Sequence, residues 1–217
     1  MYFAGGDWSG TPYRKARGTR PDFYVPGFVA FACPLEELAR EIAAVKFQIG
    51  MPQSVEIHAH TLPEAVQYAF LRMAVNLEMR VGARIIDKGT AENPCGSALP
   101  LPADFAAQAA LSVLAPFIER YDINSLWYDK DIQGPQREKE FETAVKRLNR
   151  ERWLHGGLKA RSKDSDKSEL IQMADVAAYG IGRLAMNAIE HDALRRLVTG
   201  ICSDSANTVV GPAAWKD

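Results

Sequence analysis

Four acidic residues that lie far apart in the chain each sit at the end of an apolar segment or inside one. They are Asp7, Glu56, Asp129 and Asp175. An ionised carboxylate in apolar surroundings is costly, or shifts its pKa, unless a cation neutralises it. One shared metal site would explain all four residues, so we predict that they converge in space.

Asp175 is the clearest example. On the helix predicted around it, the positions three and four residues away are Ile171, Gln172, Ala178 and Tyr179, a largely apolar face. A carboxylate on such a face needs an ammonium, a guanidinium or a metal ion as its partner.

Simpler interpretations exist for the other aspartates. Asp7 could begin a turn, because Asp, Ser and Gly in the segment DWSG all favour turns. Asp129 could be a solvated strand end, with Asp131 on the same face. Asp87 is a rival carboxylate, although Lys88 and the glycine after it indicate an ordinary turn.

A second metal chemistry is open at the second acidic position. Glu56, His58 and His60 alternate in a strand expected over 54–60, so their side chains would share one face, as H-x-H zinc ligands can. The two remaining histidines have no telling spacing. A zinc hydrolase using His58 and His60 is therefore the main rival, and His58 beside a magnesium site would instead contact substrate.

The elements that must position these residues are strands first, then strands alternating with helices. Strands are expected at 2–6, 24–32, 54–60, 81–87 and 125–129. Helices are expected at 34–49, 61–79, 103–119 and 135–152, and from Ser168 through Asp175, with a capping box at Thr61 and Glu64 and a polar loop at 155–167. This order indicates an α/β fold with a mixed β-sheet flanked by α-helices.

Composition sets the remaining limits. A chain of 217 residues that is 47% hydrophobic fits one α/β domain, expected over 1–198, with 199–217 as a loosely docked C-terminal tail. The formal net charge of -1 gives no global polyanion-binding signature. Three widely spaced cysteines argue against a disulfide framework, so a cytoplasmic location is the default. No segment approaches the ~18 apolar residues of a membrane span, and no membrane partner is expected.

Basic residues gather near two of the acidic positions. One cluster follows Asp7 and consists of Arg14, Lys15, Arg17 and Arg20. The other precedes the helix of Asp175 and consists of Lys159, Arg161, Lys163 and Lys167. Such runs are more often solvated loops, but their proximity to the carboxylates favours contact with a phosphate backbone.

The order of four short motifs carries a resemblance. They are D-x-S-G from Asp7 to Gly10, E-I-H-A from Glu56, W-Y-D ending at Asp129, and I-Q-M-A-D ending at Asp175. In this order they resemble the family catalogued as domain of unknown function thirty-eight hundred, which is assigned to the ribonuclease-H-like superfamily. The resemblance runs from Asp7 to about Arg183. Trp8 replaces the glutamate of the family's usual D-E-S-G, and Ile171 replaces the leucine of its L-Q-x-A-D.

The resemblance implies a ribonuclease-H-like mixed β-sheet and a nuclease that hydrolyses phosphodiester bonds in RNA or DNA. Asp7, Glu56, Asp129 and Asp175 would hold two Mg²⁺ or Mn²⁺ ions, which prefer oxygen ligands. Contacts to substrate are expected from Ser9, His58, Lys88, Arg161, Lys163 and Gln172. The alternative is a non-catalytic module of the same fold that binds nucleic acid or a protein partner.

Overall fold

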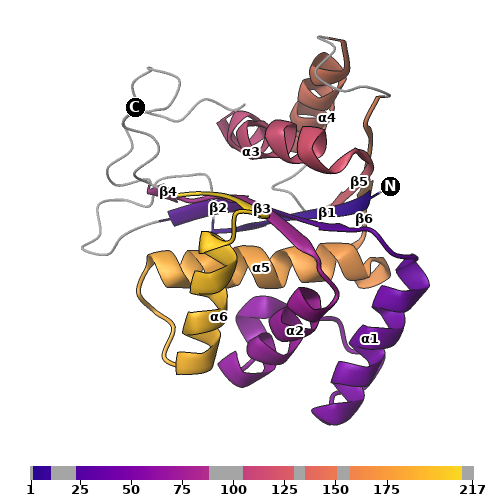
Figure 1. Ribbon diagram of the computed structural model, residues 1–217. Helices are drawn as coiled ribbons and strands as arrows, with labels where there is room; N and C mark the ends of the chain where they lie inside the picture. Colours follow the sequence, from indigo (N-terminus) through magenta and orange to yellow (C-terminus); the bar gives the residue numbers. More distant parts are fainter. Residues whose placement is uncertain (1, 11–22, 88–104, 130–134, 151–156, 212–217) are drawn as a thin grey trace.

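A mixed β-sheet of seven strands forms the central layer of the protein (Figure 1). The structure, a computed structural model, describes residues 2–10, 23–87, 105–129, 135–150 and 157–211. The strands are β1 (Tyr2–Ser9), β2 (Phe23–Phe31), β3 (Arg80–Arg84), β4 (Ile86–Asp87), β5 (Ile123–Asp129), β6 (Lys159–Lys163) and β7 (Thr208–Val210). Their order across the sheet is β6-β5-β1-β2-β3-β7, and β4 pairs with β2.

The sheet combines antiparallel and parallel pairs. The first three strands run antiparallel to one another in chain order. β5 then lies parallel to β1, and β6 lies parallel to β5. β7 closes the opposite edge by pairing in parallel with β3. The carboxyl ends of β1, β5 and β6 therefore meet at the same end of the sheet.

Helices cover both faces of the sheet. One face carries α3 (Phe105–Tyr121) and α4 (Pro135–Arg150), and the other carries α5 (Glu169–Ala185), with α1 (Leu35–Gln48), α2 (Glu64–Asn76) and α6 (Asp192–Ser203) packed around it (Figure 1). Two short 3-10 helices, η1 (Ala59–Thr61) and η2 (Ser165–Lys167), lie just before α2 and α5. A separate cluster of buried apolar side chains fills each interface. The expected α/β fold, a mixed sheet flanked by helices, is confirmed.

Several expected elements are wrong. Residues 51–58 form no strand and lead instead into η1. The expected capping box is absent, because α2 begins after Pro63 and the Thr61 hydroxyl donates to the His58 carbonyl. Part of the expected polar loop forms β6. Its sequence, KARSK, lacks the alternation of apolar and polar residues that predicts a strand. Ser168 does precede α5, but its side chain makes no capping bond.

The expected loosely docked tail is also wrong for its described part, residues 199–211. Residue 199 lies inside α6, whose Leu194, Val198 and Ile201 are buried. β7 then joins the sheet beside β3. Among the described helices, none combines the length and the apolar content that crossing a membrane requires.

Close packing of α5 on the sheet depends on two glycines. A Cβ added at Gly5 of β1 would lie 2.7 Å from Leu170 Cβ, and one added at Gly27 of β2 would lie 2.6 Å from Ala178 Cβ. Any larger residue would force the helix away from the strands, because real Cβ atoms essentially never approach this closely. The glycines thus fix the helix that carries Asp175 directly against the strand that carries Asp7.

We expect Gly5→Ala to destabilise the protein by about 1–3 kcal/mol, because the new methyl group overpacks a backbone contact. Thermal melting measures this, at about 2–4 °C for each kcal/mol in a chain of this size. Gly200→Ala in α6 is the matched control. It meets no atom within 4 Å and should be neutral or stabilising. Equal melting temperatures for the two variants would contradict the close-packing argument.

Candidate carboxylate site

Two of the four acidic residues lie on neighbouring parallel strands. Gly6 of β1 is in register with Tyr128 of β5, so Asp7 and Asp129 each come one residue later. Gly5 and Trp127, two residues before them, face the α5 side of the sheet, as their contacts with Leu170 and with the core cluster around α5 show. Because side chains alternate along a strand, Asp7 and Asp129 point to that same side.

Asp175 reaches the site from α5, a helix buried on most of its circumference. Its Oδ2 accepts a hydrogen bond of 2.8 Å from the Ala59 backbone N–H. One turn earlier, Gln172 Oε1 accepts from the Ile57 N–H at 3.2 Å. The face of α5 that bears these two side chains therefore holds the chain at residues 57–59.

Glu56 extends from the irregular segment 51–58, which we call the Glu56 arm. Ser165 Oγ donates to Glu56 Oε1, and His58 Nε2 lies 3.1 Å from Glu56 Oε2. Ser165 belongs to η2, immediately before α5. The Glu56 carboxylate thus comes from a loop, and the side chains of Ser165 and His58 contact its two oxygens.

The electrostatics place Asp7 in the field of the other three carboxylates. Burial raises the pKa of Asp7 well above its usual range, the charges of Asp175, Asp129 and Glu56 raise it further, and the Trp8 N–H bonded to Asp7 Oδ1 lowers it. Burial also raises the pKa of Asp175, with a contribution from Glu56, while the Ala59 N–H, His58 and His60 lower it. The structure therefore brings Glu56, Asp129 and Asp175 into the field of Asp7.

In the part of the chain that the structure describes, no lysine or arginine forms an ion pair with Asp7 or Asp175. Carboxylate oxygens are the donors that hard divalent cations prefer, so the residue types fit Mg²⁺ or Mn²⁺. As placed, however, no three His, Cys, Asp or Glu side chains among the described residues are close enough to hold one ion.

The amide of Gln172 is bound at both ends. The side chain is only 6% exposed, and its Nε2 donates to the Ser165 carbonyl at 2.9 Å while its Oε1 is bonded to Ile57. Both ends of the amide thus bind the protein itself, and the expected contact with substrate stays a prediction. Gln172 supports the Glu56 arm.

The other residues expected to contact substrate lie in different parts of the structure. Arg161 is exposed on β6, and Lys163, in register with Asp129, places its ammonium 4.6 Å from the centre of the Trp127 ring. Ser9 lies against α5 at Gly182. His58 is about half exposed beside Glu56. Lys88 and the basic residues of 14–20 lie outside the described residues.

The zinc interpretation gains no support from the described residues. The rings of His58 and His60 lie 6.0 Å apart, and both residues are exposed. Their common face was predicted for a strand that does not form. A third ligand is missing, since no metal-binding group of three side chains is found in the described ranges.

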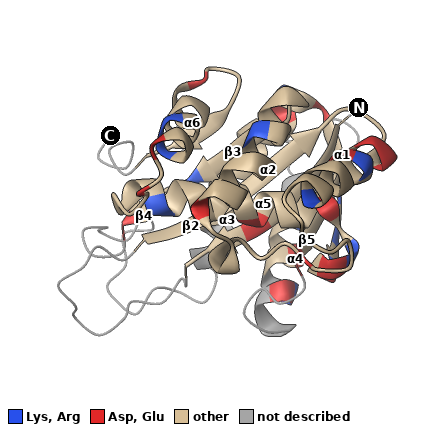
Figure 2. Cartoon of the chain, turned by 90° about the horizontal axis from the view of Figure 1, so that it is seen from below, with Lys and Arg blue, Asp and Glu red and all other residues tan. Residues whose placement is uncertain are grey.

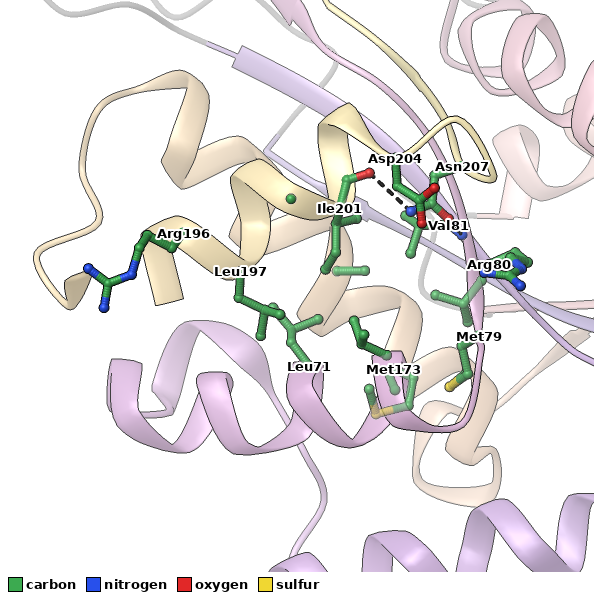
Figure 3. A pocket seen from close by; sticks show the side chains of 15 residues that line it. Leu71, Met79, Arg80, Val81, Met173, Arg196, Leu197, Ile201, Asp204 and Asn207 are labelled. Atoms are coloured by element: carbon green, nitrogen blue, oxygen red, sulfur yellow. Dashed lines mark hydrogen bonds between the residues drawn. The ribbon is translucent and has the colours of Figure 1, made fainter. Parts of the chain in front are cut away.

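A cavity of about 300 Å³ lies elsewhere, between α2, α5, α6 and β3. Figure 3 shows its apolar side chains, among them Leu71, Met173, Leu197 and Ile201. None of the four carboxylates lines it. The chemistry-bearing residues therefore lie outside this cavity.

Sequence reasoning missed two side chains at the site. Ser165 gave no signal, because a serine in a polar segment is ordinary. Lys46 did give one: it falls four residues after Ile42 and eight after Leu38 on the buried stripe of α1, and it is itself only 6% exposed. A lysine on an apolar helical stripe is rare without a partner.

The comparisons with known proteins show the fold. No protein-family model matches the sequence, and no curated protein matches it. Among solved structures, the chain is similar to ribonuclease H2 from Pyrococcus horikoshii OT3, with a TM-score of 0.52 and 12% identity over 94% of this chain and 100% of that chain. At that identity the likeness shows a ribonuclease-H-like fold alone. Membership of the family of unknown function stays a prediction.

We expect Asp7→Asn to stabilise the protein in EDTA at neutral pH. Because folding raises the pKa of Asp7 above its ordinary 3.8, the ionised group destabilises the folded state as pH rises through the raised pKa, and this penalty is absent below about pH 3.8. Asparagine removes the charge and can still accept the Trp8 N–H.

Melting curves from pH 4 to pH 8 measure this effect. The gain of the variant over wild type should grow with pH, by about 2–4 °C for each kcal/mol released. Asp192→Asn, which removes one exposed charge on α6, should show no such growth. A variant that melts below wild type at neutral pH would mean that Asp7 is paired with a cation of the protein.

Proposed function

We propose that this chain, a protein of ribonuclease-H-like fold, is a divalent-metal-dependent nuclease that hydrolyses phosphodiester bonds in nucleic acid. What supports the proposal is that Asp7 of β1 is buried within the field of carboxylates from β5, α5 and the Glu56 arm, and that burial and these charges raise its pKa. Such a cluster is costly for a folded protein unless cations bind to it.

Asp7, Glu56, Asp129 and Asp175 would hold two Mg²⁺ or Mn²⁺ ions. When bound, such ions activate water and stabilise charge on the leaving oxygen of a phosphodiester. Burial raises the pKa of Asp7 and Asp175, so these two carboxylates would gain most from a bound cation. The site lies at the carboxyl ends of β1 and β5, where both strands end and substrate can approach.

Nucleic acid is the substrate class that the surroundings support. Positions of acidic and basic residues are interspersed along the helices of the face covered by α1, α2, α5 and α6 (Figure 2), so we look for phosphate contacts in a local group of basic residues. Beside Asp129, β6 presents Lys159, Arg161 and Lys163 along a sheet edge. Contact between Lys163 and Trp127 keeps that ammonium next to the site. His58 and Ser9 are further candidate contacts.

Activity should depend on added Mg²⁺ or Mn²⁺ and should be lost in Asp175→Asn. The variant keeps the acceptor for the Ala59 N–H, so its fold should persist and, in EDTA, its melting temperature should equal or exceed that of wild type. Labelled single-stranded RNA, single-stranded DNA, duplex DNA and RNA–DNA hybrid form the assay panel, because the similar structure is that of a ribonuclease.

Three results would overturn the proposal in different ways. Binding of nucleic acid with no cleavage under any metal condition would favour the non-catalytic module of the same fold. A large loss of stability of Asp175→Asn in EDTA would show that the carboxylate is a structural partner. Zinc retained through purification and removed by His58→Ala would favour the zinc hydrolase.

We expect Arg161→Gln/Lys163→Gln to weaken nucleic-acid binding similarly for all sequences. For each phosphate that the variant no longer neutralises, the slope of log affinity against log salt should fall by about 0.7–0.9. Arg72→Gln/Arg196→Gln is the control, because it removes the same charge from exposed positions on α2 and α6. If the salt dependence of binding is unchanged in the β6 variant, Arg161 and Lys163 are solvated surface residues that do not contact phosphate.

A further inference from the structure

We propose that Lys46 and Ser165 are positioning residues that set the carboxylate of Glu56 in the metal site. The inference rests on the proposed function and names two side chains that would determine how well the site binds its ions. Neither residue is itself offered as a ligand.

The Glu56 arm needs side chains to hold it because it belongs to no strand or helix. Buried backbone N–H and C=O groups must find partners, and an isolated loop has no ladder to supply them. At the end of the arm, Gln172 and Asp175 bind the N–H groups of Ile57 and Ala59. These bonds fix the chain just after Glu56.

Lys46 fixes the chain just before Glu56. Its Nζ donates to the carbonyls of Gln53 at 3.2 Å and Val55 at 2.6 Å. The Gln53 side chain in turn donates to the Ala43 carbonyl at 2.9 Å, which ties the same loop back to α1. Glu56 therefore projects from a segment that is held on both sides, by α1 before it and by α5 after it.

The position of Lys46 makes it more than a packing residue. Among the described residues no carboxylate forms an ion pair with it, and an almost fully buried ammonium is costly. Its donors are used on the arm, and its charge lies in the field of Glu56 and Glu169. The same amine thus holds the arm and lies in the field of the Glu56 carboxylate.

Ser165 acts on the carboxylate directly. Its hydroxyl donates to Glu56 Oε1, and its own carbonyl accepts from Gln172 Nε2. Gln172 also holds Ile57, so one buried amide sets both the residue that orients Glu56 and the backbone that carries it. Second-sphere partners of this kind commonly change metal affinity by about 10–100-fold when removed.

Titration calorimetry with Mn²⁺ tests the proposal on wild type, Lys46→Met, Ser165→Ala and Asn207→Ala. We expect both arm variants to bind Mn²⁺ about 10–100-fold more weakly than wild type. Asn207→Ala is the matched control. Its side chain also holds two backbone groups, but beside β3 and α6: it accepts from the Val81 N–H and donates to the Ile201 carbonyl, and Figure 3 shows the bond to Ile201. The affinity of this variant for Mn²⁺ should equal that of wild type.

A double-mutant cycle with Glu56→Gln separates positioning from general loosening of the fold. If Lys46 and Ser165 act through Glu56, neither substitution should weaken Mn²⁺ binding further in the Glu56→Gln background. Additive reductions in affinity would overturn the proposal, as would a Lys46→Met protein that does not fold, since Lys46 would then be a stability residue.

The same titrations distinguish this inference from the function on which it rests. Wild type that binds no Mn²⁺ overturns the metal-dependent nuclease and the positioning roles with it. Wild type and both arm variants that bind Mn²⁺ equally, while Glu56→Gln binds weakly, leave the proposed metal site standing and overturn the positioning roles alone.

Discussion

The contact between α5 and the β1–β2 pair is the constraint on which the candidate site depends. Helix and sheet approach closely because Gly5 and Gly27 have no side chains to separate them. That approach lets a helix residue, Asp175, share one electrostatic environment with a strand residue, Asp7. A wider gap would admit water, weaken their interaction and leave two ordinary carboxylates.

The same closeness creates an electrostatic penalty that the rest of the fold tolerates. Burial, and after it the neighbouring like charges, raises the pKa of Asp7 and so reduces stability at neutral pH. The apolar cores on both faces of the sheet supply the stability that offsets this penalty. Groups that oppose folding in this way are typical of sites kept for function.

The Glu56 arm shows how an irregular segment can be placed without a sheet. Its backbone is held by polar side chains of α1 and α5, and Gln67 of α2 holds the carbonyls of Ala59 and Leu62 just beyond it. Three helices that pack together for hydrophobic reasons thus define the path of a polar loop. The path of the backbone on both sides of Glu56 is a consequence of that packing.

The sequence by itself determined the mixed α/β class, because apolar periodicity is a local property that survives in each segment. It also singled out Asp7, Glu56, Asp129 and Asp175 by their apolar surroundings. Only the tertiary structure decided that 51–58 is no strand, that basic β6 is one, and that β7 joins the sheet, since each depends on a distant partner. It also decided the hydrogen-bond partners of Gln172 and Ser165, because a hydrogen bond across more than 100 residues leaves no mark in the local pattern.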